Sequence, residues 1–179
     1  MGRNPEGIEI VKIRRVVTGR NQEGKGVVQW DSEIDAIPGR PGFSQAPLWA
    51  TRQLPAKLTD EDPSTWEIGT TLSGGSVFRV IRYEPGVAKR NHQTDSIDYA
   101  VVLSGEIDME LDEGEIHLKA GDVLIQRATR HNWVNRGTEP CVIAFVLISR
   151  RAGIPPGGDK AITQRTSFAQ ASFSSRNQA

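Results

Sequence analysis

Residues 96–126, SIDYAVVLSGEIDMELDEGEIHLKAGDVLIQ, decide the fold of this 179-residue chain. Within this stretch, Glu106–Leu111 alternates between acidic and apolar residues, which is the two-residue period of a half-buried β-strand. Turn-forming sequences at 112–114 (DEG) and 120–122 (AGD) separate it from the next two apolar segments. Short strands joined by tight turns predict an antiparallel sheet.

The same pattern extends to both sides of this stretch. We expect strands at Ser76–Glu84, Tyr99–Leu103, Glu106–Leu111, Glu115–Lys119, Val123–Gln126, Trp133–Asn135 and Cys141–Ile148. Closely spaced strands with turn signals between them are typical of an all-β sandwich or barrel. The expected barrel core therefore occupies residues 76–150.

Residues 1–75 are predicted to form an N-terminal hairpin and a wrapping arm. The hairpin is expected over residues 8–30, with a turn between two apolar stretches, and the proline-rich part that follows is expected to be irregular except for a short strand at Leu48–Thr51. Residues 151–179 contain Pro155-Pro156-Gly157-Gly158 and end in Ser, Gln and Asn, so an extended tail is predicted there.

Charge and hydropathy narrow the classes of partner. Twenty-two basic residues balance 22 acidic residues, which argues against a nucleic-acid partner. The longest apolar run, Cys141–Ile148, is far shorter than the ~20 residues of a membrane-spanning helix, and the first residues, MGRNPEG, lack the apolar core of a signal peptide. We therefore expect a soluble, cytoplasmic protein with neither a nucleic-acid nor a membrane partner. Because Cys141 is the only cysteine, it is expected to pack as a small apolar side chain.

Two of the expected strands, YAVVL and CVIAFVLI, are apolar throughout and do not alternate. A strand with one face in water alternates, so the outer faces of these two strands should be covered. The N-terminal hairpin of the same chain or of a second copy is the available cover, and we therefore expect a homodimer.

The three histidines differ in their sequence surroundings. His117, in EIHLK, falls on the polar face of an alternating strand and should face solvent, whereas His92 and His131 each precede a strand. With Asp95 and Asp98 nearby in sequence, two imidazoles at the mouths of two strands could bind a metal such as iron, manganese, nickel, zinc or copper. Two surface histidines at loop ends are the alternative interpretation.

Two motifs resemble those of the cupin family. In the first motif, five residues separate Gly86 from His92-Gln93-Thr94, three more separate Thr94 from Asp98, and six separate Asp98 from Gly105. The second motif runs from Gly121 to His131-Asn132-Trp133-Val134-Asn135. The resemblance covers about residues 76–148. It implies a cupin jelly-roll β-barrel with an N-terminal strand arm, and it implies that His92, Asp98 and His131 are the ligands of a divalent metal ion.

The sequence departs from the cupin pattern at three points. Thr94 replaces the second histidine of the first motif, Asp98 replaces its glutamate, and the second motif is one residue short between its glycine and its histidine. Thr94 is expected to orient water or substrate from the vacated ligand position. These departures leave open a metal-free barrel in which His131 and Asp98 act as acid and base, or one that only binds a small ligand.

Alternation predicts which other side chains face the interior. If His131 points inward, Trp133 does too, and Gln126, Arg127 and Arg79 are expected to contact a substrate. An arginine in an apolar barrel favours a carboxylate or an enolate. Together with these residues, the resemblance implies a metal-dependent enzyme that acts on a small organic molecule, as an oxygenase, decarboxylase, dehydratase or isomerase. The predicted catalytic residues are His92, His131, Asp98 and Thr94.

Overall fold

The computed structural model describes residues 12–150, and this part of the chain is built almost entirely of β-strands. A single turn of 3-10 helix, η1 (Pro63–Thr65), interrupts them. The strands are β1 (Lys12–Arg20), β2 (Gly26–Asp35), β3 (Ile37–Pro38), β4 (Phe43–Thr51), β5 (Ser76–Tyr83), β6 (Ser96–Ser104), β7 (Glu106–Leu111), β8 (Glu115–Lys119), β9 (Val123–Arg127), β10 (His131–Val134) and β11 (Cys141–Ser149).

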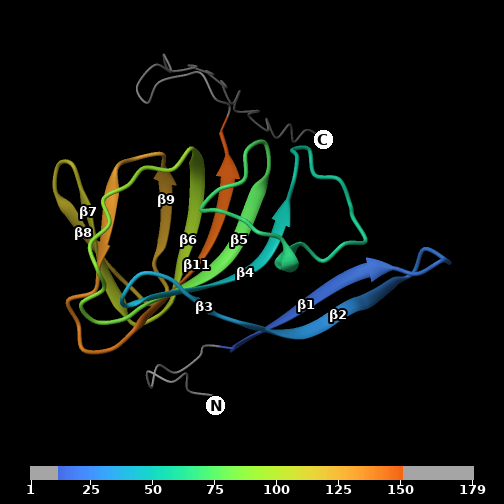
Figure 1. Ribbon diagram of the computed structural model, residues 1–179, viewed down its shortest axis with the longest axis horizontal. Helices are drawn as coiled ribbons and strands as arrows, with labels where there is room; N and C mark the ends of the chain where they lie inside the picture. The colour runs from blue at the N-terminus through green and yellow to red at the C-terminus, as the bar shows by residue number, and fades with distance from the viewer. Residues whose placement is uncertain (1–11, 151–179) are drawn as a thin grey trace, which may run out of the picture.

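Two antiparallel sheets form the body of the molecule (Figure 1). The larger has the order β3-β4-β5-β11-β6-β9 and the smaller has the order β10-β7-β8. Side chains from both sheets form one core, in which Ile107 and Met109 of the smaller sheet belong to the same cluster as Ile143 and Phe145 of the larger. The predicted all-β jelly-roll is thus confirmed, and each of the seven strands expected between residues 76 and 150 is present.

Three glycines make the turns that the two motifs require. Gly86, Gly105 and Gly121 have φ angles of 69°, 72° and 93°, a region of backbone conformation that side chains disfavour. At Gly105 a Cβ atom would also collide with the carbonyl oxygen of Pro140. Backbone geometry therefore favours glycine over other residues at these three positions.

The segment after the hairpin is more regular than the sequence indicates. β2 continues to Asp35, and β4 pairs with β5 along its whole length, from Phe43 opposite Tyr83 to Thr51 opposite Ser76. The expectation of an irregular stretch was wrong here because Pro47 is accommodated beside a register shift, where a strand tolerates a proline. The boundary expected at residue 76 consequently runs through a continuous sheet, and the predicted tail, 151–179, lies outside the described residues.

The β1–β2 hairpin packs across the outer face of β4 and β5, while its tip projects away from the body (Figure 1). Ile13 and Ile34 of the hairpin contact a cluster formed by Ala46, Leu48 and Val80. The buried Arg15 guanidinium pairs with Asp62 at 2.5 Å and donates to the carbonyl oxygen of Leu48 at 3.2 Å. Asp62 also caps η1 by accepting from the backbone N–H of Ser64.

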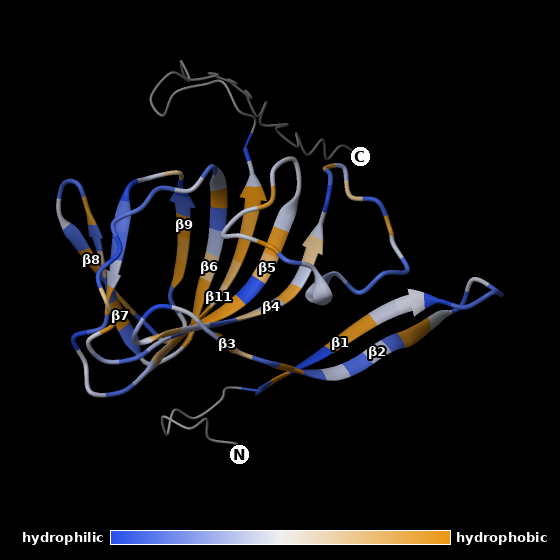
Figure 2. Ribbon diagram, viewed as in Figure 1, coloured by the Kyte–Doolittle hydropathy of each residue, from blue (hydrophilic) through white to orange (hydrophobic). Residues whose placement is uncertain are grey.

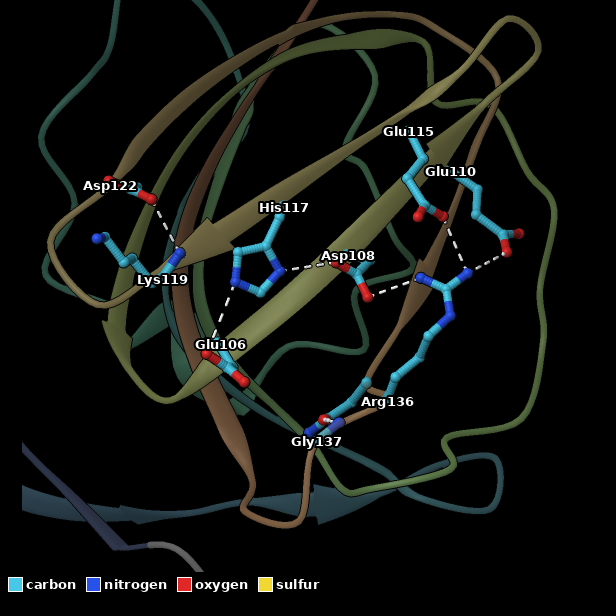
Figure 3. A network of polar contacts seen from close by, with 10 residues as sticks. Glu106, Asp108, Glu110, Glu115, His117, Lys119, Asp122, Arg136 and Gly137 are labelled. Atoms are coloured by element: carbon cyan, nitrogen blue, oxygen red, sulfur yellow. Dashed lines mark hydrogen bonds and ion pairs between the residues drawn. The ribbon is translucent and has the colours of Figure 1, made fainter.

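The outer face of the smaller sheet carries a network of charged side chains (Figure 3). His117 lies 2.8 Å from Asp108, and Arg136 joins Asp108 to Glu110 and Glu115. The hydrogen bond with Asp108 raises the pKa of His117 above its usual value. The His117 side chain is 55% exposed, so it faces solvent as its position in an alternating strand predicts.

Cys141 is fully buried in the core between the sheets. Burial raises the pKa of its thiol to about 12, so the thiolate is scarce at neutral pH. The prediction that it packs as an apolar side chain is confirmed. Of residues 12–150, none lies in a helix long and apolar enough to cross a membrane.

We predict that Asp62→Asn destabilises the protein by about 3 kcal/mol, because it leaves the buried Arg15 guanidinium without a carboxylate. Asparagine still caps η1, so the loss reports the ion pair. Arg15 lowers the pKa of Asp62 from 3.8 to about 2, and the pair therefore stabilises fully above pH 3.8. The difference between wild type and variant in urea unfolding should shrink as the pH falls towards 2.

Arg14→Gln is the matched control for this prediction. Arg14 is the neighbour of Arg15 in β1 and also pairs with a carboxylate, Asp31, but both partners are exposed. Exposed pairs contribute about 0–1 kcal/mol, so this variant should unfold almost like wild type. Equal losses from Asp62→Asn and Arg14→Gln would contradict the role given to the buried pair.

Candidate functional site

His92 and His131, which are far apart in the sequence, lie side by side in the structure. Their backbones form an isolated antiparallel bridge, in which each N–H donates to the carbonyl oxygen of the other residue at 2.9–3.0 Å. Directly opposed residues of such a bridge present their side chains on the same face. The two imidazole rings accordingly lie with centroids 4.3 Å apart.

Both imidazoles line a cavity of about 80 Å³ between the two sheets. Apolar walls come from Phe43, Ile81, Tyr83, Trp133, Phe145 and Leu147. The polar lining comes from Arg40, Gln45, Thr70, Arg79, Arg90, His92, Thr94, Asp98, Gln126 and His131. A small concave pocket with apolar walls and converging polar groups is the usual form of a small-molecule site.

One ring nitrogen of each histidine is held by the protein. Nδ1 of His92 lies 3.1 Å from the carbonyl oxygen of Arg90, which only accepts, so the neutral ring carries its proton on Nδ1. Nδ1 of His131 lies 2.7 Å from Nε2 of Gln126 and 3.0 Å from the carbonyl oxygen of Thr129. A donor and an acceptor at this nitrogen support either tautomer of His131, so its Nε2 can give or take a proton.

Burial keeps both imidazoles neutral. Desolvation lowers the pKa of His92 and of His131 below the usual value for histidine, and the charge on Arg90 lowers both further. Within residues 12–150, Nε2 of neither ring has a hydrogen-bond partner. Two neutral imidazoles with free Nε2 atoms are therefore available to a ligand.

Asp98 lies in the same cavity but is bound to its neighbours in β6 and in the approach to that strand. Its carboxylate accepts hydrogen bonds from the hydroxyls of Ser96 and Thr94, the latter at 3.3 Å. Desolvation raises the pKa of Asp98, and these two hydroxyls oppose that shift. Thr94 is thus buried against Asp98, so the expectation that it orients water or substrate gains no support from its contacts.

The side chains at this place do not fit a metal centre with three protein ligands. In the part of the chain that the structure describes, no group of three or more His, Cys, Asp or Glu side chains is arranged to hold a metal ion. The two imidazoles come together, but the carboxylate of Asp98 is engaged by two hydroxyls. We therefore derive no chemical step through a metal here.

Arg79 contributes a guanidinium to the wall of the cavity from β5. It is 3% exposed and donates to Gln45 Oε1 and to the carbonyl oxygens of Gly69 and Thr70, at 2.6 and 3.0 Å. Burial lowers its pKa, although an arginine remains charged at neutral pH. The cavity thus holds a positive charge beside the histidine pair.

Most of the residues predicted from the sequence to form the site do line this cavity. They are Arg79, His92, Thr94, Asp98, Gln126, His131 and Trp133. Arg127 does not. It alternates with the buried Gln126, is exposed and lies opposite Ile97 on the outer face of the sheet, so the expectation that it contacts a substrate is not met.

Sequence reasoning missed the contribution of the segment before β5. Arg40, Phe43 and Gln45 line the cavity, and Arg40 lies over the Phe43 ring with its guanidinium carbon 4.4 Å from the ring centroid. Alternating residues in FSQAPLWAT were the available signal, but three prolines around them favoured a loop. Arg90 was also missed, although it lies two residues before His92.

Comparison with known proteins gives the family. Residues 79–148 match the profile of the Cupin domain family. The chain is 41% identical over 146 residues to Phomopsin biosynthesis cluster protein C' of Diaporthe leptostromiformis, covering 74% of this chain and 76% of that protein. It is 35% identical over 148 residues to the cupin-domain-containing oxidoreductase fogC of Aspergillus ruber, covering 76% and 72%.

Among solved structures, KdgF from Halomonas sp. matches with a TM-score of 0.46 at 18% identity, over 65% of this chain and 89% of that one. The family assignment depends on the sequence relatives, which match about three quarters of both chains. By this similarity, and by the jelly-roll that carries the paired histidines, the chain belongs to the family of cupin-domain proteins.

Proposed function

We propose that this cupin is an enzyme that moves protons on a small organic substrate, with His92 and His131 as the groups that give and take the proton. The observation that carries the proposal is the pair of neutral imidazoles in one cavity, each with Nδ1 held by the protein and Nε2 free. Side chains of this type, placed within reach of a bound substrate, are the usual agents of general acid–base catalysis.

The reaction class that fits is proton abstraction beside a carbonyl group. Nε2 of one histidine takes the proton of a C–H bond, and the electron pair of that bond becomes the π bond of an enolate. The proton then returns from Nε2–H to a different atom, which gives an isomerisation, or it protonates a departing hydroxyl, which gives a dehydration. His131 suits both directions because its Nδ1 has a donor and an acceptor within reach.

The names of the relatives support a setting in small-molecule biosynthesis. Two of them are named as proteins of the phomopsin biosynthesis cluster and another as protein J of the oryzines biosynthesis cluster. We propose that the substrate of this chain is likewise an intermediate in the synthesis of a small organic product.

A metal-dependent oxidoreductase is the second proposal. Four of the relatives are named cupin-domain-containing oxidoreductases, and two adjacent imidazoles are suitable ligands for iron, manganese, nickel or zinc. A third protein ligand, Asp98, would first have to leave the hydroxyls of Ser96 and Thr94. The acid–base proposal needs no such rearrangement.

The acid–base proposal predicts loss of proton exchange in either histidine variant. Hydrogen–deuterium exchange beside the carbonyl of acetoacetate, pyruvate and 2-oxoglutarate can be followed by ¹H NMR in D₂O. His92→Gln and His131→Gln should each lower the catalysed rate on an accepted compound by about 10²–10⁴-fold, the contribution of one acid or base.

His117→Gln is the matched control for this experiment, since His117 lies on the outer face of the smaller sheet. It should exchange at the wild-type rate. If the His92 and His131 variants keep the native circular dichroism spectrum and the wild-type exchange rate, the acid–base proposal fails.

Metal content separates the two proposals. If the acid–base proposal holds, protein purified without added metal should contain far less than one equivalent of iron, manganese, nickel or zinc by elemental analysis. Its exchange activity should then survive dialysis against EDTA. One equivalent of metal in wild type that is lost in His92→Gln and His131→Gln, but kept in His117→Gln, would instead support the metal-dependent oxidoreductase.

A further inference from the structure

Two arginines are buried in the described part of the chain, and only one has a carboxylate bound to it. Arg15 pairs with Asp62 under the hairpin, whereas all the hydrogen-bond acceptors of Arg79 are neutral amide oxygens. A buried guanidinium is costly unless an anion compensates its charge. Arg79 therefore lacks the type of partner that the other buried arginine has.

Two polar atoms, on side chains that line the same cavity, are buried and have no hydrogen-bond partner within residues 12–150. They are Nε of Arg79, a donor, and Oε1 of Gln126, an acceptor, and each side chain is 3% exposed. Buried polar groups are satisfied in nearly all proteins, so an unpaired donor and an unpaired acceptor in one cavity indicate a ligand that completes them.

The charges around the cavity indicate the sign of that ligand. Arg40, Arg79 and Arg90 contribute three positive charges to the lining, and Asp98 is its one acidic residue. With three arginines against one aspartate, the lining has an excess of positive charge. The four aromatic side chains in the walls, those of Phe43, Tyr83, Trp133 and Phe145, suit a flat apolar body attached to the anion.

We propose that the ligand of this cavity is a small carboxylic acid whose carboxylate accepts a hydrogen bond from Nε of Arg79 and which also carries a donor for Oε1 of Gln126. This inference rests on the proposed function for the location of the site and names the class of its substrate. An oxyanion at Arg79 compensates the charge of the buried guanidinium, and the same contact gives its Nε–H group a hydrogen-bond acceptor.

Binding of benzoate, measured by isothermal titration calorimetry, tests the inference, with neutral benzamide of the same shape as the reference. Wild type should bind benzoate at least 10-fold more tightly than benzamide. Arg79→Gln should weaken benzoate binding by about 10- to 100-fold, the range for a hydrogen bond to a charged group, and should leave benzamide binding unchanged. Arg82→Gln is the control, because Arg82 lies on the outer face of the same strand and pairs with Glu84.

Equal affinity of wild type for benzoate and benzamide would overturn the inference, and this comparison decides it even if Arg79→Gln does not fold. A similar loss in Arg82→Gln and Arg79→Gln would overturn it as well. The experiment requires no turnover. Selective benzoate binding combined with wild-type exchange in His131→Gln would therefore refute the acid–base proposal and leave the carboxylate site standing.

A second inference concerns the outer face of the larger sheet. The strand register aligns Ile125, Tyr99, Val146, Phe78 and Trp49 in one apolar row across β9, β6, β11, β5 and β4. A neighbouring row consists of Val123, Val101, Ala144, Val80 and Ala46. The outer faces of β6 and β11, the two non-alternating strands, are thus apolar, and Figure 2 shows hydrophobic residues along β11 and most of β6.

The hairpin covers only one end of this face. It packs over Ala46, Leu48 and Val80 on β4 and β5, whereas the side chains at the other end are 38–65% exposed. These exposed side chains are Ile97, Tyr99, Val101, Leu103, Val123 and Ile125. Their exposed parts amount to roughly 600 Å², near the upper limit for a patch on a monomer and near the ~800 Å² that each partner buries in a standard interface.

We infer that a second copy of this chain covers the β6–β9 end of the face. In a two-fold dimer the same patch meets itself, so a charge inside it would face its own copy. The six side chains of the patch carry no charge, and Arg127, which lies opposite Ile97, stands at its edge. Residues 151–179 offer a poorer cover, because they are mainly small and polar, with Phe168 and Phe173 as their only aromatic residues.

The mass of the full chain in solution, measured by light scattering after gel filtration, tests this inference. Wild type should have twice the 19.7 kDa of one chain, and Val123→Glu and Ile125→Glu should have the monomer mass with an unchanged circular dichroism spectrum. Leu58→Glu is the control, because Leu58 is 94% exposed and lies outside the patch, and it should stay dimeric. A monomeric wild type, or a dimer that survives both β9 substitutions, would overturn the inference.

Discussion

The backbone bridge between His92 and His131 is the constraint on which the site depends. Two hydrogen bonds join the approach to β6 with the start of β10, and these segments belong to different sheets. The bridge therefore links the approach to β6 with β10 of the other sheet and at the same time sets the two imidazoles side by side. Because the arrangement is fixed by main-chain hydrogen bonds, it needs no metal ion to hold the two rings together.

Local patterns predicted the barrel, because the two-residue period and the turn glycines are properties of neighbouring residues. Glu106–Leu111 alternates in sequence, and its apolar side chains Ile107 and Met109 are buried as that pattern requires. The spacing between motifs also brought His92, Asp98 and His131 to one cavity. It could not reveal that the hydroxyls of Ser96 and Thr94 engage the carboxylate, since that depends on side-chain direction at the start of β6.

Sequence reasoning missed the cavity wall formed by residues 40–45 for a different reason. Prolines favour loops when they are considered alone, but Pro47 lies in β4 beside a register shift, where the sheet tolerates a residue without an N–H donor. The strand then aligns Gln45 opposite Ile81 and Phe43 opposite Tyr83. Long-range pairing thus overrode local preference, and it placed Gln45 within reach of Arg79.

The charge of the cavity and the protonation of its histidines depend on each other. Burial lowers the pKa of both imidazoles, and the positive charge of Arg90 lowers it further, so this environment favours neutral rings. A carboxylate bound at Arg79 would offset that positive charge and raise the pKa of both rings. An acidic ligand would thereby strengthen the bases that act on it, and under the two proposals the buried arginine would contribute to proton transfer as well as to binding.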